Sequence, residues 1–133
     1  MHYILSDIHG NERRFHSILH QIDLRPEDTL YVLGDVIDRH PGGFRILRRL
    51  MAMPNAKLLL GNHEYMMLRA LGHPADDNPD DGTALAHWPM EVWHGENRIG
   101  IDCGSGYPEH GELSPYGRLA CLRLEDGKIF YSK

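Results

Sequence analysis

Three short polar blocks dominate this chain, and each one directly follows an apolar run. The blocks are Asp-Ile-His-Gly at 7–10, Gly-Asp-Val-Ile-Asp-Arg at 34–39 and Gly-Asn-His-Glu at 61–64. One helix-length segment separates each apolar run from the next, and strands that alternate with helices predict a parallel sheet with right-handed connections. The carboxyl ends of such strands meet at one edge of the sheet, where ligand sites usually lie. We therefore expect the three blocks to converge.

The apolar pattern predicts the elements of the first 72 residues. Strands are expected at 3–6, 29–33 and 57–60, and helices at 11–22, from 41–43 to 54–55, and at 64–71. Asn11 is the expected N-cap of the first helix. Helical spacing predicts three buried faces: Phe15, Ile18, Leu19 and Ile22; Phe44, Leu47, Leu50 and Met51; and Tyr65, Leu68 and Leu71.

The pattern changes after residue 72. Residues 72–83 and 103–118 are rich in glycine and proline and are expected to form loops, and residues 84–97 have no clear period. A short strand is expected at 99–102. Residues 119–124 and 128–131 predict a hairpin, because Asp126-Gly127 between them favours a tight turn. The last third of the chain should therefore be antiparallel.

Composition restricts the classes of protein to which the chain can belong. A length of 133 residues fits one domain. The net charge of −5 provides no basic surplus to neutralise phosphates, which argues against nucleic acid as a partner. Two cysteines form no disulfide framework, and neither a membrane-length apolar run nor a signal peptide is visible. We expect a cytoplasmic protein with reduced thiols and no membrane partner.

The residue types in the blocks suit a metal centre. Asp7 and His9 could reach one divalent ion, since a carboxylate oxygen and an imidazole nitrogen both bind Mn, Fe or Zn. Asp35 follows the second strand and could bridge two ions. Asn62 follows the third strand and offers an amide oxygen to the second ion. Two such ions would lower the pKa of a bound water and supply a hydroxide nucleophile.

Three further residues of the blocks suit phosphate chemistry. His63 could protonate a leaving alkoxide as general acid, and Asp38 could orient that imidazole. Arg39 offers a planar fork for two phosphate oxygens. Glu64 is interpreted as a helix N-terminal residue that favours the helix dipole rather than as a ligand.

Together, the three motifs resemble those of the calcineurin-like metallophosphoesterases, and more narrowly those of the serine/threonine protein phosphatase-like branch, which includes bacterial enzymes of the diadenosine-tetraphosphatase type. The close resemblance covers residues 1–72, and residues 97–104 are similar to the family's late strand and glycine turn. It implies an α/β (α+β) fold, a β-sandwich flanked by helices. It also implies metal roles for Asp7, His9, Asp35 and Asn62, acid catalysis by His63 with Asp38, and phosphate binding by Arg39.

The chain departs from the family pattern after Glu64. The family continues with two more histidine ligands of the second metal, and this chain has neither of their motifs. We interpret residues 1–133 as one internally shortened domain that lacks part of the second sheet and its helices. Residues 1–72 form the motif-bearing half, 73–97 a loop with the apparent deletion junction, and 98–133 a β-rich carboxy-terminal part.

Other histidines offer replacements for the missing pair. His87 and His94 flank the apparent junction and are the better candidates, whereas His73 and His110 are weaker ones. If none of them serves, only one of the two divalent ions expected from the family is retained.

Two functional hypotheses follow. The first is a manganese-type metal-dependent phosphatase that hydrolyses phosphate monoesters, with phosphoserine or phosphothreonine proteins or small phosphoesters as substrates. The second is a weak or inactive remnant that binds metal or phosphate, because one ion cannot clamp both the nucleophile and the leaving oxygen. The lost segment should also leave apolar sheet surface uncovered, so we expect self-association as a homo-oligomer or marginal stability.

Overall fold

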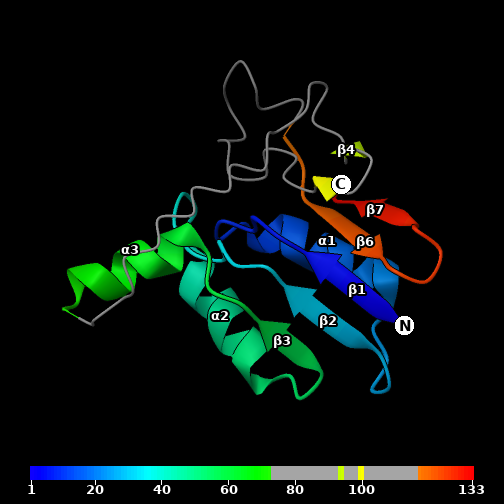
Figure 1. Cartoon of the computed structure of the whole chain (residues 1–133), viewed down its shortest axis with the longest axis horizontal. Helices are drawn as coiled ribbons and strands as arrows, with labels where there is room; N and C mark the ends of the chain where they lie inside the picture. The colour runs from blue at the N-terminus through cyan, green and yellow to red at the C-terminus, as the bar shows by residue number, and fades with distance from the viewer. Residues whose placement is uncertain (73–92, 95–98, 101–116) are drawn as a thin grey trace.

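The computed structural model describes residues 1–72, 93–94, 99–100 and 117–133, and these contain a five-stranded sheet in the order β3-β2-β1-β6-β7 (Figure 1). The strands of this sheet are β1 (His2–Leu5), β2 (Thr29–Val32), β3 (Ala56–Leu58), β6 (Ala120–Arg123) and β7 (Ile129–Tyr131). Strand β1 pairs in parallel with β2, and β2 with β3, which confirms the predicted parallel arrangement of the amino-terminal half.

The carboxy-terminal hairpin is also confirmed. Strands β6 and β7 pair antiparallel, and β6 pairs antiparallel with β1. The hairpin therefore extends the same sheet on the far side of β1 from β2 (Figure 1). Its turn contains Gly127, whose φ of 69° is a conformation that glycine adopts without strain.

The first two helices connect the parallel strands, as predicted. Helix α1 (Glu12–Ile22) begins after Asn11, whose side chain accepts a hydrogen bond from the Arg14 backbone N–H. Such a cap stabilises a helix by about 1 kcal/mol. Helix α2 (Gly43–Ala52) follows the second polar block.

Both helices pack on one face of the sheet and share one hydrophobic core. Alternate residues of β1 and β2 point to that face, among them Leu5, Leu30 and Val32, which are fully buried. Phe15 and Ile18 of α1 join the same core. Its remaining buried members are Tyr3, Ile8, Ile22, Val36, Ile46, Leu50, Leu119, Cys121 and Phe130.

The predicted buried face of α2 was partly wrong. Leu50 is buried and Leu47 half-buried, but Phe44 is 63% exposed and Met51 75% exposed. Ile46 and Leu50, four residues apart, face the sheet instead. At about 100° per residue, Phe44 and Met51 point away from the side of the helix that carries that pair.

Helix α3 (Asn62–Ala70) extends away from the sheet (Figure 1). Tyr65 and Leu68 are half-buried, as their spacing predicted. Leu71, predicted to be buried, is 68% exposed because it lies beyond the end of the helix.

A second, two-stranded sheet pairs β4 (Trp93–His94) antiparallel with β5 (Ile99–Gly100). Strand β5 confirms the start of the strand predicted at 99–102. Of the loops predicted at 72–83 and 103–118, residues 73–83 and 103–116 lie outside the described residues. None of the helices among the described residues combines the length and the apolar character that a bilayer crossing requires.

Candidate metal centre

The polar loops after β1 and β2 are joined by backbone hydrogen bonds. The His9 N–H donates to the Asp35 carbonyl oxygen at 2.9 Å, and the Gly10 N–H donates to the Val36 carbonyl oxygen at 2.7 Å. The first two polar blocks therefore lie against each other at the carboxyl edge of the sheet, as the strand order predicted.

The loops after β2 and β3 approach each other through glycines. A Cβ on Gly34 would overlap the backbone of Gly61, and a Cβ on Gly61 would overlap the backbone nitrogen and carboxylate of Asp35. Gly34 also has a φ of +92°. Only glycine fits this close approach, which places Asn62 and His63 beside Asp35.

Left-handed backbone is concentrated in the polar blocks. Six non-glycine residues of the described chain have positive φ, and the five in these blocks are Asp7, His9, Asp35, Asp38 and Arg39. The sixth, Asp23, ends helix α1. Each such residue costs on the order of 1–3 kcal/mol and persists only where the surroundings enforce it. Strain of this kind typically marks a functional site.

Asp35 lies at the centre of the site and is half-buried. Its Oδ1 accepts the backbone N–H of His63 at 3.0 Å. The Asn62 amide lies against the same carboxylate, and with its nitrogen turned inward it donates to Oδ2 and Oδ1 at 2.6 and 2.9 Å. Burial, and then the nearby charge of Asp7, raise the pKa of Asp35. This carboxylate is one that a cation would stabilise.

His9 is only 4% exposed, and its two ring nitrogens face different groups. Nδ1 lies 3.3 Å from the Ile37 carbonyl oxygen, and Nε2 lies 3.6 Å from Oδ1 of Asp7. Burial lowers the pKa of His9, but the contact with Asp7 and its charge outweigh that effect, so the pKa is raised overall. The exposed Arg39 acts against this rise through its positive charge.

His63 pairs with Asp38, as predicted. His63 Nδ1 lies 2.8 Å from Oδ2 of Asp38. The ring of His63 also lies edge-on to that of His9, with their centroids 4.7 Å apart. The third polar block therefore meets the other two.

These residues fit a divalent cation. Ligand atoms of His9, Asp35 and His63 all lie within 4.8 Å of one another. Asp7 contacts His9, so a second carboxylate adjoins the group, and the Asn62 amide lies against Asp35. Nitrogen and carboxylate donors suit Mn, Fe or Zn. The structure brings all the predicted ligands together, while their roles as ligands stay predictions.

Glu64 lies in the first turn of α3, as predicted, but sequence reasoning missed the contacts of its side chain. This side chain is buried, with 2% exposure, and accepts backbone hydrogen bonds from both the second and the third polar block. A signal was available in the sequence, because Glu64 follows Gly61 by three residues, and in the structure the Gly61 N–H donates to Glu64 at 3.0 Å. That is the capping-box pattern, in which an acid at the third helical position reaches back to the N-cap.

Among the described residues, no candidate replacement histidine lies at the site. His94 lies exposed in β4, paired with Ile99, and is not part of the cluster of His9, Asp35 and His63. The other three candidates, His73, His87 and His110, lie outside the described residues.

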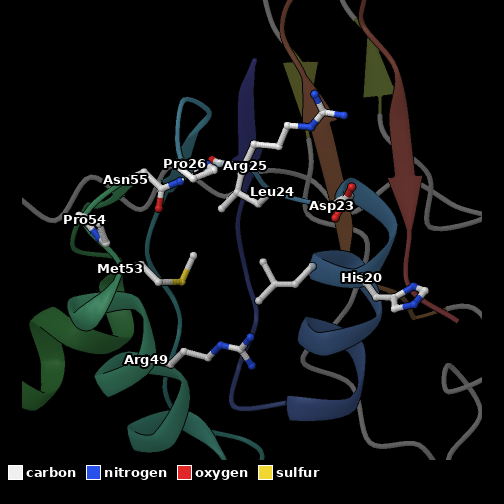
Figure 2. Close-up of a pocket in the computed structure, with 10 residues that line it drawn as sticks. His20, Asp23, Leu24, Arg25, Pro26, Arg49, Met53, Pro54 and Asn55 are labelled. Atoms are coloured by element: carbon white, nitrogen blue, oxygen red, sulfur yellow. Dashed lines mark hydrogen bonds between the residues drawn. The ribbon is translucent and has the colours of Figure 1, made fainter.

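A groove lies elsewhere, between the carboxyl-terminal ends of α1 and α2 (Figure 2). Leu24, Arg49 and Met53 line it, together with other residues of 23–26, before β2, and of 54–55, before β3. It therefore lies at the edge where these strands begin, opposite the polar blocks, and none of the predicted site residues lines it.

The comparisons with known proteins agree with this geometry. The sequence profile described as "Calcineurin-like phosphoesterase" matches residues 3–130. Symmetrical bis(5'-nucleosyl)-tetraphosphatases of Citrobacter koseri and Salmonella newport are each 32% identical over 81 residues, 59% of this chain. The match spans only 29% of those relatives' length.

A solved structure of a protein described as a candidate diadenosine tetraphosphatase superposes with a TM-score of 0.60. The superposition covers 98% of this chain and 91% of the other, at 17% identity, which shows a shared fold. The observed sheet with its helices is thus the metallophosphoesterase fold. With the family profile spanning nearly the whole sequence, the chain belongs to the calcineurin-like phosphoesterase family.

Proposed function

We propose that this protein is a metal-dependent phosphoesterase. The observation that carries the proposal is the convergence of His9, Asp35 and His63, whose side-chain nitrogen and oxygen atoms lie within 4.8 Å of one another, so that two expected ligands and the expected acid share one site. Membership of the calcineurin-like phosphoesterase family supports the same reaction class. A remnant that binds metal without turnover is the competing outcome.

Asp7, His9, Asp35 and Asn62 would hold the divalent ions. Ions in such a site lower the pKa of a water toward ~7 and stabilise negative charge on phosphate oxygens. Asp35 would serve both ions where two bind, because a carboxylate offers two oxygens. Its Oδ1 also accepts the His63 backbone N–H. Whether one ion or two bind is part of the test.

His63 would act as the general acid. An imidazolium here donates its Nδ1–H to Asp38, and its Nε2–H remains for the leaving oxygen. Asp38 thereby orients the ring. Arg39 is exposed at the same loop and would bind phosphate oxygens through its planar fork.

Dinucleoside tetraphosphates are the first substrate class to test, because the names of the sequence relatives specify them. Their acidic phosphate chain matches the expected chemistry of the metal site and Arg39. Phosphoserine and phosphothreonine proteins are the second class, from the resemblance of the motifs to that branch of the family.

The test is turnover by the purified chain in Mn²⁺, with diadenosine tetraphosphate, a phosphoserine peptide and p-nitrophenyl phosphate as substrates. Asp35→Asn should reduce turnover at least about 100-fold, since removing a key electrostatic group has that order of effect. The control is Asp23→Asn, the same chemical change at a position where Asn also tolerates left-handed backbone. Absence of turnover on all three substrates would favour the non-catalytic remnant.

A further inference from the structure

One buried carboxylate connects the loops that carry the candidate metal ligands. Glu64 lies in the first turn of α3, and its side chain reaches into the loop after β2. Its Oε1 accepts the backbone N–H groups of Val36 and Ile37 at 2.7 and 3.1 Å. Its Oε2 accepts those of Asp35 and Gly61 at 2.8 and 3.0 Å.

This arrangement requires a carboxylate. Each oxygen of Glu64 accepts two N–H groups, and an ionised carboxylate offers only acceptor sites. A glutamine would turn an NH₂ group toward two N–H donors, so half of the bonds would be replaced by repulsive contacts. Burial of Glu64 makes such a mismatch costly, because water cannot replace the lost partners.

The four bonds act on the backbone that presents the site. Asp35, whose backbone N–H donates to Glu64, has a left-handed φ of 51°. Ile37, whose N–H is also held, places its carbonyl oxygen 3.3 Å from Nδ1 of His9. Gly61, whose backbone N–H donates to the same carboxylate, directly precedes Asn62 and His63.

We propose that Glu64 is the positioning residue of the metal centre, and that it binds no metal itself. It fixes the loop after β2 to the start of α3, so that Asp35, His9 and His63 stay in one place before an ion binds. This inference rests on the proposed function, because it assumes that His9 and Asp35 hold an ion and that His63 acts beside it.

The experiment compares Mn²⁺ affinity by calorimetry in wild type, Glu64→Gln and Glu64→Asp. Asp28→Asn is the matched control, because Asp28 is also a buried carboxylate that accepts a backbone N–H, that of Arg25, away from the polar blocks. Native-state amide hydrogen exchange of Asp35, Val36, Ile37 and Gly61 is measured on the same metal-free proteins. Turnover of diadenosine tetraphosphate is measured in parallel.

Glu64→Gln should weaken Mn²⁺ binding by at least about tenfold, the order found when a residue that supports metal ligands is lost. It should also speed exchange of the four amides. Glu64→Asp keeps the charge but is one methylene shorter, and should show a smaller loss; it gives the answer if the Gln variant does not fold. Asp28→Asn should leave Mn²⁺ affinity unchanged below its melting temperature.

Three different results would contradict the positioning role of Glu64, the proposed function, or both. Faster exchange with unchanged Mn²⁺ affinity in both Glu64 variants would overturn the positioning role and leave only a structural one. Metal binding that depends on Glu64 without any turnover in wild type would overturn the proposed function alone. Failure of wild type to bind Mn²⁺ would overturn both.

Discussion

His63 and Asp38 form the hydrogen-bonded pair on which the proposed acid catalysis depends. His63→Asn should lower turnover by about 10²–10⁴ for a substrate with a poor leaving group, such as phenyl phosphate, because general acids contribute that much. The loss should be far smaller for p-nitrophenyl phosphate, whose leaving group needs little protonation. His16→Asn, at an exposed position of α1, is the control. Equal losses on both substrates would contradict the assignment of His63 as the acid.

Asp28 provides a prediction about stability and pH. The α-amino group of Met1, at 2.6 Å, and the Arg25 N–H, at 3.0 Å, donate to its carboxylate and lower its pKa. A carboxyl group with a lowered folded-state pKa stabilises the fold above its unfolded pKa of about 3.9 and loses this effect as the pH falls through the folded value.

Asp28→Asn should therefore lower the urea midpoint at pH 7 and at pH 5, and its difference from wild type should shrink only below about pH 4. Glu27→Gln, a neighbouring change at an exposed position, should have almost no effect at any pH. An equal difference at pH 3 and pH 7 would show that the charge of Asp28 does not matter.

At the residue scale, sequence reasoning predicted which side chains come together, because their types and spacing are visible without coordinates. Asp7, His9, Asp35 and His63 all lie where the strand ends placed them. The role of Glu64 could not be predicted in full. Its four hydrogen bonds depend on two loops meeting in space, and only the one to Gly61 is local in sequence.

At the scale of elements, α2 gives the sharpest prediction. Ile46 is buried against the sheet, whereas Phe44 on the same helix is exposed. Ile46→Ala should cost about 2–5 kcal/mol in the free energy of unfolding, and Phe44→Ala should cost about 0.5 kcal/mol or less. Urea unfolding of the two variants measures both values. A larger loss of stability for Phe44→Ala than for Ile46→Ala would mean that Phe44 is on the buried face, as the sequence pattern predicted.

The face of α2 was hard to predict because two apolar stripes compete in ten residues. Phe44, Leu47 and Met51 recur at helical spacing as well as Ile46 and Leu50 do. The rotation of α2 about its own axis decides between them, and packing in the folded molecule sets it; Gly43, for example, lies close against Ile37. The pairing of β6 with β1 could likewise not be predicted, since it joins segments more than 100 residues apart.

At the scale of the whole molecule, exposed apolar residues follow the ends of β2 and β3. Leu33, Leu59 and Leu60 are all exposed. Because an exposed apolar patch often marks an interface, we expect the chain to self-associate through these side chains. Light scattering at micromolar concentration should give a mass above the 15.2 kDa of one chain, and Leu60→Glu should lower it. A stable, monodisperse monomer would contradict this expectation.

The central claim is that the three polar blocks form a divalent metal centre. The most direct measurement is anomalous scattering from crystals of the wild-type chain grown with Mn²⁺. We predict a peak within about 2.5 Å of donor atoms of Asp7, His9 and Asp35, the distance range of metal–oxygen and metal–nitrogen bonds. A second peak about 3.5–4 Å away would show a two-metal site. No Mn²⁺ peak among these residues would contradict the account.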